Sequence, residues 1–114
     1  MYRFASMAAV VAALAVSGTV GAQQFPGKPI RIVVPFAAGG PSDITSRNIA
    51  PKMTELLGAS IVVDNRGGAN GFIGAEIVAK APPDGYTLLS ATASITSINM
   101  VVYHKRPYDT LRDF

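Results

Sequence analysis

The sequence contains no cysteine and only one histidine among its 114 residues. Disulfides and thiolate metal sites are therefore excluded, because both require cysteine. A histidine-based metal site or a Ser/His/Asp triad would have to use His104, which lies beside Lys105 and Arg106 with no supporting pattern around it. We expect His104 on a solvated surface, and we expect no metal and no cofactor.

Charged residues are also sparse. They make up 15% of the sequence, and the formal net charge is only +3. Proteins that bind nucleic acid concentrate Lys and Arg on one face, and no basic cluster of that kind occurs here. Nucleic acid is therefore not an expected partner.

The first 22 residues have the three-part pattern of a secretory signal. A short basic start with Arg3 precedes an uncharged apolar run over residues 4–16, and a segment of small residues ends at Ala22. A transmembrane anchor is the alternative, but the Ser, Thr, Gly and Gln residues of 17–24 make a poor membrane core. We expect cleavage near Ala22 and a periplasmic location for residues 23–114.

Strand and helix patterns alternate after this leader. Residues 30–34, 61–63 and 86–91 are predicted strands, and residues 44–57 and 72–80 are predicted helices. A β-α-β-α-β order implies an α/β fold with a parallel sheet. Residues 92–99 are expected to form a polar loop that leads into a further helix, and Asp109 or Thr110 is a candidate helix cap.

The apolar residues of each helix predict its buried face. Pro51 should kink the first helix or limit its regularity, and Gly58 should end it. The positions expected to face inward are Ile44, Ile49, Met53, Leu56 and Leu57 in the first helix, and Ile73, Ile77 and Val78 in the second.

The segment that follows the first strand is the strongest functional signal. Residues 35–43 read PFAAGGPSD, a Gly-Gly turn between a strand and a helix, with Ser42 and Asp43 as helix caps by residue type. Such a turn leaves backbone N–H groups and the positive end of the helix dipole facing one spot, which favours an anion. A tight turn without a ligand is the structural alternative.

A second polar loop should lie beside the first. In open parallel sheets, ligands bind at the carboxyl ends of the strands near a change in strand order. If the strand order is 2-1-3, the loop after the first strand and residues 92–96 after the third are neighbours.

The glycines of residues 68–74, GANGFIG, suggest a competing function. This Gly-x-x-Gly-x-x-Gly pattern resembles the phosphate loop of extended short-chain dehydrogenases. However, residues 64–67 separate it from the preceding strand, and the acidic residue expected at the end of the next strand is missing, since Asp84 lies before that strand. A dinucleotide-binding enzyme remains the weaker alternative.

Several sequence blocks, in order, resemble the Bug family of substrate-binding proteins of tripartite tricarboxylate transporters. The blocks are KPIRIVVPFAAGG at 28–40 with Asp43, LG at 57–58 with VVDNR at 62–66, Gly71 with IGAE at 73–76, AKAPPDGYTLL at 79–89, and PYD at 107–109 with DF at 113–114. The resemblance covers nearly all of residues 25–114. Where the family has Asn-Arg-Pro-Gly-Ala-Gly-Gly, this chain has NRGGANG at 65–71, with Gly67 in place of proline and Asn70 in place of glycine.

The resemblance implies a periplasmic solute-binding protein with a type II, two-lobed fold, of which residues 23–114 would form part of the first lobe and the second lobe is missing. The ligand would be a small carboxylate, such as a di- or tricarboxylate, and the partners would be the membrane carrier subunits of the transporter. Such a protein makes and breaks no bond, so no catalytic residue is expected. The implied ligand-binding residues are Phe36, Ala37, Ala38, Gly39, Gly40, Ser42 and Asp43 from the first loop, and Thr92, Ala93 and Ser94 from the second. Asp43 would hold water or cap the helix, since it would repel a carboxylate.

The sequence from Pro107 to Phe114 looks like a turn that enters a new element. We therefore expect the chain to be the front part of a longer protein. Two alternatives follow: a non-functional fragment with an unpaired sheet edge, and a periplasmic enzyme of the same architecture.

Overall fold

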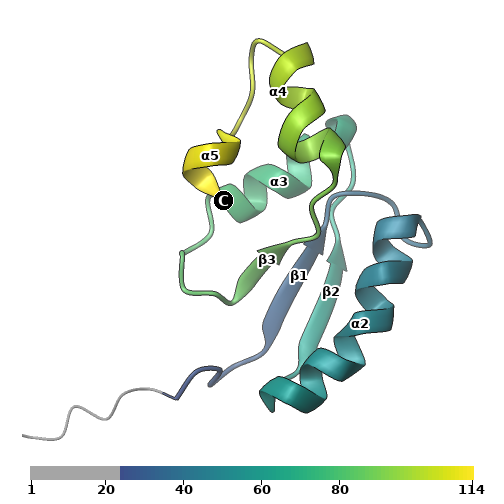
Figure 1. The fold of residues 1–114 in the computed structure, drawn as a ribbon, viewed down its shortest axis with the longest axis vertical. Helices are drawn as coiled ribbons and strands as arrows, with labels where there is room; N and C mark the ends of the chain where they lie inside the picture. Colours follow the sequence, from purple (N-terminus) through teal and green to yellow (C-terminus); the bar gives the residue numbers. More distant parts are fainter. Residues whose placement is uncertain (1–23) are drawn as a thin grey trace, which may run out of the picture.

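The computed structural model describes residues 24–114, so the leader and its cleavage near Ala22 lie outside the described residues. Three strands form one parallel sheet: β1 (Ile30–Val34), β2 (Ile61–Asn65) and β3 (Thr87–Leu89). The sheet order is β2-β1-β3, with Ile32 of the central strand aligned to Val63 on one side and Leu88 on the other. The predicted α/β class and strand order are confirmed (Figure 1).

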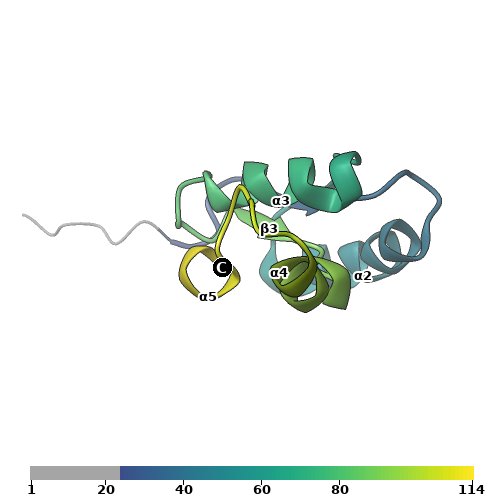
Figure 2. The same cartoon turned by 90° about the horizontal axis from the view of Figure 1, so that it is seen from above.

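Helices cover both faces of the sheet. Helix α2 (Pro41–Leu57) packs on β1 and β2, and helix α3 (Phe72–Ala79) lies on the opposite face beside β3 (Figure 2). The central strand is almost completely enclosed, and Val33 and Val34 have no exposed surface. This burial on both faces explains the nearly continuous β-branched sequence of β1.

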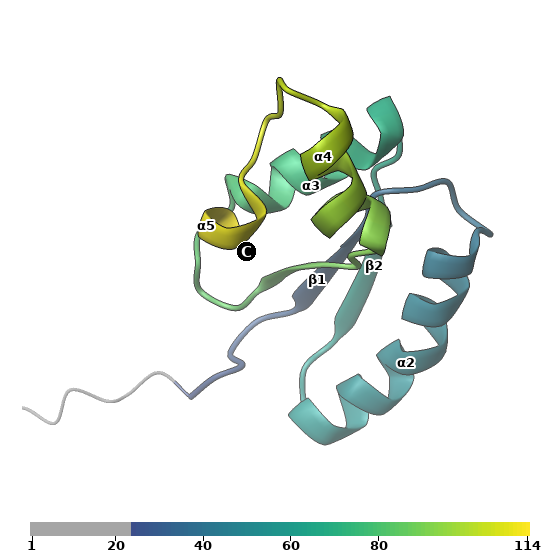
Figure 3. The same cartoon turned by 45° about the horizontal axis from the view of Figure 1, so that its top comes forward.

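The remaining elements are short. All but the last lie beyond the carboxyl ends of the strands, whereas the last, at the C-terminus, lies toward the outer edge of β3 (Figures 1 and 3). They are a 3₁₀ turn η1 (Ala69–Gly71), a π-helical turn η2 (Ser94–Ile98), helix α4 (Asn99–Val102) and helix α5 (Thr110–Asp113). Ile95 and Tyr108 from this region join Ala75 of α3 in a buried cluster. Asp109 caps α5, as predicted, and accepts hydrogen bonds from the N–H groups of Leu111 and Arg112.

The predicted inward face of α2 is wrong. Ile44, Ile49 and Leu56 are exposed, with 72% of Leu56 accessible, Leu57 is also exposed, and Met53 is only half-buried. The side of α2 that meets the sheet instead carries Asp43, Ser46 and Ala50. Small or hydrogen-bonded side chains let the helix approach the strands closely. Close packing therefore decides which face of α2 is buried, and the apolar spacing does not.

The same effect appears in α3. Ile73 is 47% exposed, contrary to the prediction, and Ile77 and Val78 are half-buried. Gly74 and Ala75 are the buried residues of this helix. Two backbones that pack closely leave no room for isoleucine at the contact.

Several element boundaries also differ from the prediction. Helix α2 begins at Pro41 and continues through Pro51, and Gly58 ends it in the left-handed conformation expected of a C-terminal stop. Strand β3 is shorter than residues 86–91, and residues 94–98 are already helical where a loop was expected.

Candidate functional site

The loop after β1 turns sharply into helix α2. Gly39 has a left-handed φ of 81°, and the N–H of Gly40 donates to the carbonyl of Ala37 over 3.3 Å. Gly40 is the residue that precedes the helix, and Pro41 occupies its first position. Ser42 and Asp43 therefore occupy the second and third positions of the helix, and the prediction that their side chains cap it is wrong.

Backbone donors at this helix start lack partners in the described part of the chain. Within residues 24–114, the N–H groups of Ala37, Ala38, Ser42 and Asp43 have no hydrogen-bond acceptor. The first N–H groups of a helix lack partners inside the helix, and the helix dipole makes this end partly positive. The loop can therefore accept the oxygens of an anion.

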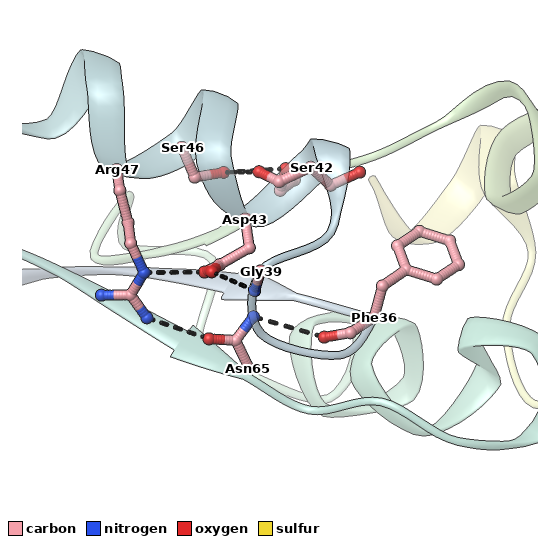
Figure 4. A network of polar contacts seen from close by, with 8 residues as sticks. Phe36, Gly39, Ser42, Asp43, Ser46, Arg47 and Asn65 are labelled. Carbon is pink, nitrogen blue, oxygen red and sulfur yellow. Dashed lines mark hydrogen bonds and ion pairs between the residues drawn. The ribbon is translucent and has the colours of Figure 1, made fainter.

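Asp43 holds this loop from within. Its side chain is buried and accepts hydrogen bonds from the Gly39 N–H at 2.8 Å and from Arg47 Nε at 2.9 Å (Figure 4). The hydrogen bond from Gly39 is the main cause that holds the pKa of Asp43 below its usual value of 3.8; Asn65 and Arg47 also lower the pKa, and burial opposes them. Asp43 is therefore a carboxylate at neutral pH.

Asn65, at the end of β2, completes this polar network. Its side-chain amide donates to the carbonyl of Phe36 over 3.3 Å, and its oxygen accepts a hydrogen bond of 3.0 Å from Arg47 (Figure 4). The roles of Asn65 and Arg47 were not predicted from the sequence. The four-residue spacing of Asp43 and Arg47 on a helix could have revealed their ion pair.

A chain of serines connects the two predicted loops. Ser46 Oγ donates to the carbonyl of Ser42 over 2.7 Å and lies 3.0 Å from Ser90 Oγ, just after β3. Ser46 is only 3% exposed. The first turn of α2 is thereby tied to the strand end that leads into the second loop.

Replacing Ser46 with alanine should lower the free energy of unfolding by about 1 kcal/mol, because the Ser42 carbonyl and the Ser90 hydroxyl each lose a hydrogen-bond partner. Urea unfolding followed by circular dichroism measures this loss. Thr45→Ala is the matched control, since Thr45 is the exposed neighbour in the same helix and gains similar helix propensity. Equal stabilities of the two variants would contradict a role for Ser46 in joining the loops.

The second loop bends into η2. The N–H groups of Ile95 and Thr96 both donate to the carbonyl of Thr92 over 3.0 Å. Among the described residues, the Ala93 N–H has no acceptor, and the buried Thr92 Oγ1 has no hydrogen-bond partner. Turns of the π type occur often at functional sites.

The two loops meet around one pocket, so their predicted adjacency is confirmed. The pocket has a volume of about 400 Å³ and is lined by Phe36, Ala37, Gly40, Pro41, Ser42, Thr92 and Ser94. Six of the ten predicted ligand-binding residues therefore line it, whereas Ala38, Gly39, Asp43 and Ala93 do not. The lining has no charged side chain, and Asp43 points into the network that supports the loop (Figure 4).

A larger pocket of about 610 Å³ lies along the outer edge of β3, between α3 and the C-terminal turn. Arg112 and Asp113 line it, but they pair with each other over 2.7 Å. We place the candidate site in the smaller pocket, because only there do a helix start and two strand ends converge.

The glycines of residues 68–74 have packing roles. A Cβ on Gly74 would lie 2.7 Å from both the carbonyl oxygen of Arg66 and the Cα of Pro35, and a Cβ on Gly71 would overlap the end of the Ile95 side chain. These contacts account for two of the three glycines of the pattern without a nucleotide. The pocket between the loops contains none of them.

Residues 24–114 provide no cluster of three or more His, Asp or Glu side chains suited to a metal ion. In the same part of the chain, none of the helices is both long enough and apolar enough to cross a membrane.

Curated relatives cover most of this chain. A protein encoded in the tcbD–tcbE intergenic region of Pseudomonas sp. (strain P51) is 46% identical over 90 residues, which are 79% of this chain and 26% of the relative. Protein BugT of Bordetella pertussis is 36% identical over 104 residues, which are 90% of this chain and 32% of BugT. The chain thus spans about a quarter to a third of the length of these relatives.

Solved structures show the same likeness. A structure described as a periplasmic transporter is 46% identical to this chain and has a TM-score of 0.75. The match covers 77% of this chain and 30% of the chain in that structure. An R. palustris protein solved with adipate has a TM-score of 0.72 and 42% identity, and the match covers 76% of this chain and 29% of that protein's chain. MatC from Rhodopseudomonas palustris, solved with bound malate, has a TM-score of 0.59 and 39% identity, and the match covers 73% of this chain and 29% of the MatC chain.

The sequence profile of one family matches residues 45–114, which is more than half of the chain and includes the second loop of the pocket. This match agrees with the relatives and with the structural neighbours. The chain belongs to the family described as tripartite tricarboxylate transporter family receptor.

Proposed function

We propose that this chain supplies one half of the ligand site of a periplasmic solute-binding protein, which captures a small carboxylate for a tripartite tricarboxylate-type transporter. The observation that carries the proposal is the pocket shared by the loop after β1 and the loop after β3. Both loops present backbone N–H groups without acceptors among residues 24–114.

The chemistry of the pocket suits a carboxylate group. Two oxygens can accept from the N–H groups at the start of α2, where the helix dipole adds attraction. Ser42, Thr92 and Ser94 are among the lining residues, and the buried Thr92 Oγ1 has no hydrogen-bond partner among residues 24–114. Asp43 is engaged by Gly39 and Arg47, which keeps its negative charge out of the lining.

The structural neighbours support this ligand class. Adipate and malate are both dicarboxylates, and each was solved with a protein about 40% identical to this chain. We propose that a second lobe, of the kind found in two-lobed binding proteins, closes over the ligand by a hinge motion. Residues 24–114 would then form part of the first lobe.

We propose export to the periplasm through residues 1–22 and delivery of the ligand to membrane carrier subunits. The relatives and neighbours carry names that refer to binding, reception or transport. Binding without catalysis is therefore the proposed activity.

The test is a titration of the ¹⁵N-labelled 114-residue chain with adipate and with malate, followed by NMR. We expect shifts concentrated at the amides of Ala37, Ser42 and Ser94, with a dissociation constant in the millimolar range because one lobe provides only half of the contacts. The uncharged diamide of adipate is the matched control ligand. Shifts that are absent, scattered over the surface or equal for the diamide would contradict the proposal.

Replacing Ala93 with proline should weaken binding of both dicarboxylates about tenfold, because proline removes an N–H that has no acceptor within residues 24–114 and lies between Thr92 and Ser94 of the pocket lining. The φ of Ala93 is −55°, which proline adopts without strain. The same titration measures the loss, and circular dichroism checks that the fold is retained. An unchanged affinity would exclude the Ala93 N–H as a ligand donor.

A further inference from the structure

Asn70 and Asn99 are joined by two hydrogen bonds, one between their side chains and one from the Asn99 side chain to the Asn70 backbone. Asn70 Nδ2 donates to Asn99 Oδ1 over 2.9 Å, and Asn99 Nδ2 donates to the carbonyl of Asn70 over 3.3 Å. Asn99 has no exposed surface. A buried amide that lost these partners would be left with unsatisfied polar atoms, so the pair fixes the distance between its two segments.

The two segments belong to different parts of the chain. Asn70 lies in η1, in the glycine-rich loop after β2, and has a left-handed φ of 54°. Asparagine is among the few residues besides glycine that adopt this conformation readily. Asn99 follows directly on η2, whose first residue is Ser94 of the pocket lining.

A second contact fixes the other end of η2. Gly71 follows Asn70, and its missing side chain makes room for the fully buried side chain of Ile95. Tyr108 Oη donates to the carbonyl of Ile95 over 2.7 Å. Asn70 therefore holds the C-terminal end of η2 through hydrogen bonds to Asn99, and Gly71 holds the N-terminal end through packing against Ile95.

We propose that Asn70 and Asn99 are positioning residues for the ligand site: their side-chain pair holds η2 so that Thr92, Ala93 and Ser94 face the loop after β1. This inference rests on the proposed function for the identity of the site, although the contact itself does not depend on a ligand. Where the family resemblance places glycine, Asn70 adds a side-chain link between the glycine-rich loop and the pocket.

The test is Asn70→Gly, measured by amide hydrogen exchange of the 114-residue chain by NMR. Glycine keeps the left-handed backbone and removes only the side chain, so the variant should fold. We expect exchange at the Ile95 and Thr96 amides to become about tenfold faster, because Asn99 loses a partner beside their helical turn. The Gly58 amide, which donates to the Thr54 carbonyl at the far end of α2, should keep its rate.

Ala69→Gly is the matched control. Ala69 also has a positive φ, of 47°, but it contributes no side-chain hydrogen bond to Asn99. Its replacement should leave exchange at Ile95 and Thr96 unchanged. The proposal is overturned if Asn70→Gly has no effect there, if it accelerates Gly58 equally, or if Ile95 and Thr96 are unprotected in the unchanged chain.

A ligand titration of the same variant separates this inference from the proposed function. Faster exchange together with about tenfold weaker dicarboxylate binding supports both. If the unchanged chain binds no dicarboxylate while Asn70→Gly still loosens Ile95 and Thr96, the proposed function fails and the structural role of the pair stands. If Asn70→Gly loosens η2 but binds dicarboxylates as tightly as the unchanged chain, the positioning role is wrong.

Discussion

Replacing Gly74 with alanine is expected to lower the free energy of unfolding by about 3 kcal/mol, near the upper end of the usual cost of overpacking. The added Cβ would lie 2.7 Å from the carbonyl oxygen of Arg66 and 2.7 Å from the Cα of Pro35. Both are backbone atoms, so neither can move aside by changing a rotamer. Helix α3 would have to shift away from the point where β1 ends and the loop after β1 begins.

The direction of this effect is informative, because alanine favours a helix over glycine by about 1 kcal/mol. A net loss therefore reports the close contact and not the helix propensity. Urea unfolding followed by circular dichroism gives the magnitude.

Gly39→Ala is the control for Gly74→Ala. Gly39 has a φ of 81°, but a Cβ there would meet no atom within 4 Å. Its replacement should cost about 1 kcal/mol, from backbone strain alone. If Gly74→Ala costs no more than Gly39→Ala, the close packing of α3 on Pro35 does not limit stability.

The sequence predicted the features of the fold that depend on local signals. The β-branched run of β1, the stop at Gly58 and the turn before β3 are local signals, and they led to the correct strands, helices and sheet class. The contact of Gly74 with Pro35 joins residues far apart in the sequence. Its glycine was visible, but only the folded chain shows which backbone it approaches.

The buried faces of the helices were predicted less well, for a related reason. The spacing of apolar residues along a helix predicts which face is buried when apolar side chains form the contact with the core. In α2, the face against the sheet contains Asp43 and Ser46, whose side chains are hydrogen-bonded to the Gly39 N–H of the loop after β1 and to Ser90, respectively. Polar residues that serve a site can therefore displace apolar ones from the inner face of a helix.

The position of the candidate site was predictable, whereas its support was not. The Gly-Gly turn after β1 and the polar loop after β3 pointed to the sheet edge where the candidate pocket lies. Asn65 and Asn99 act through partners 29 residues away in sequence, at Phe36 and Asn70. Asparagine is common in loops, so nothing in the local sequence distinguished these two.

Replacing Asp43 with asparagine is expected to lower the melting temperature by several degrees and to weaken dicarboxylate binding about tenfold. Asparagine retains one acceptor for the Gly39 N–H, but its NH₂ group and lack of charge remove the ion pair with Arg47. Arg47 would then be less well placed to hold Asn65 and, through it, the carbonyl of Phe36. Thermal unfolding and the NMR titration measure the two effects.

The pH dependence of stability gives an independent signature of Asp43. Its pKa in the folded protein lies below the usual 3.8, so its contribution is fully present above about pH 4 and is lost as the pH falls through the folded-state pKa. Asp43→Asn should therefore lose less stability than the unchanged chain between about pH 5 and about pH 2. Some acid sensitivity should remain, because the pKa values of Asp64, Asp84 and Asp113 are also lowered.

Asp84→Asn is the matched control for Asp43→Asn. Asp84 pairs with Lys28 over 3.3 Å in the turn before β3, at the opposite end of the sheet from the pocket. Asp84→Asn should reduce the acid sensitivity without changing dicarboxylate affinity, since Asp84 contacts neither of the two loops that line the pocket. If both variants bind dicarboxylates equally well, the network around Asp43 stabilises the fold but does not shape the site. If only Asp43→Asn loses affinity, its buried carboxylate acts on the ligand through the loop that it holds, because Asp43 itself does not line the pocket.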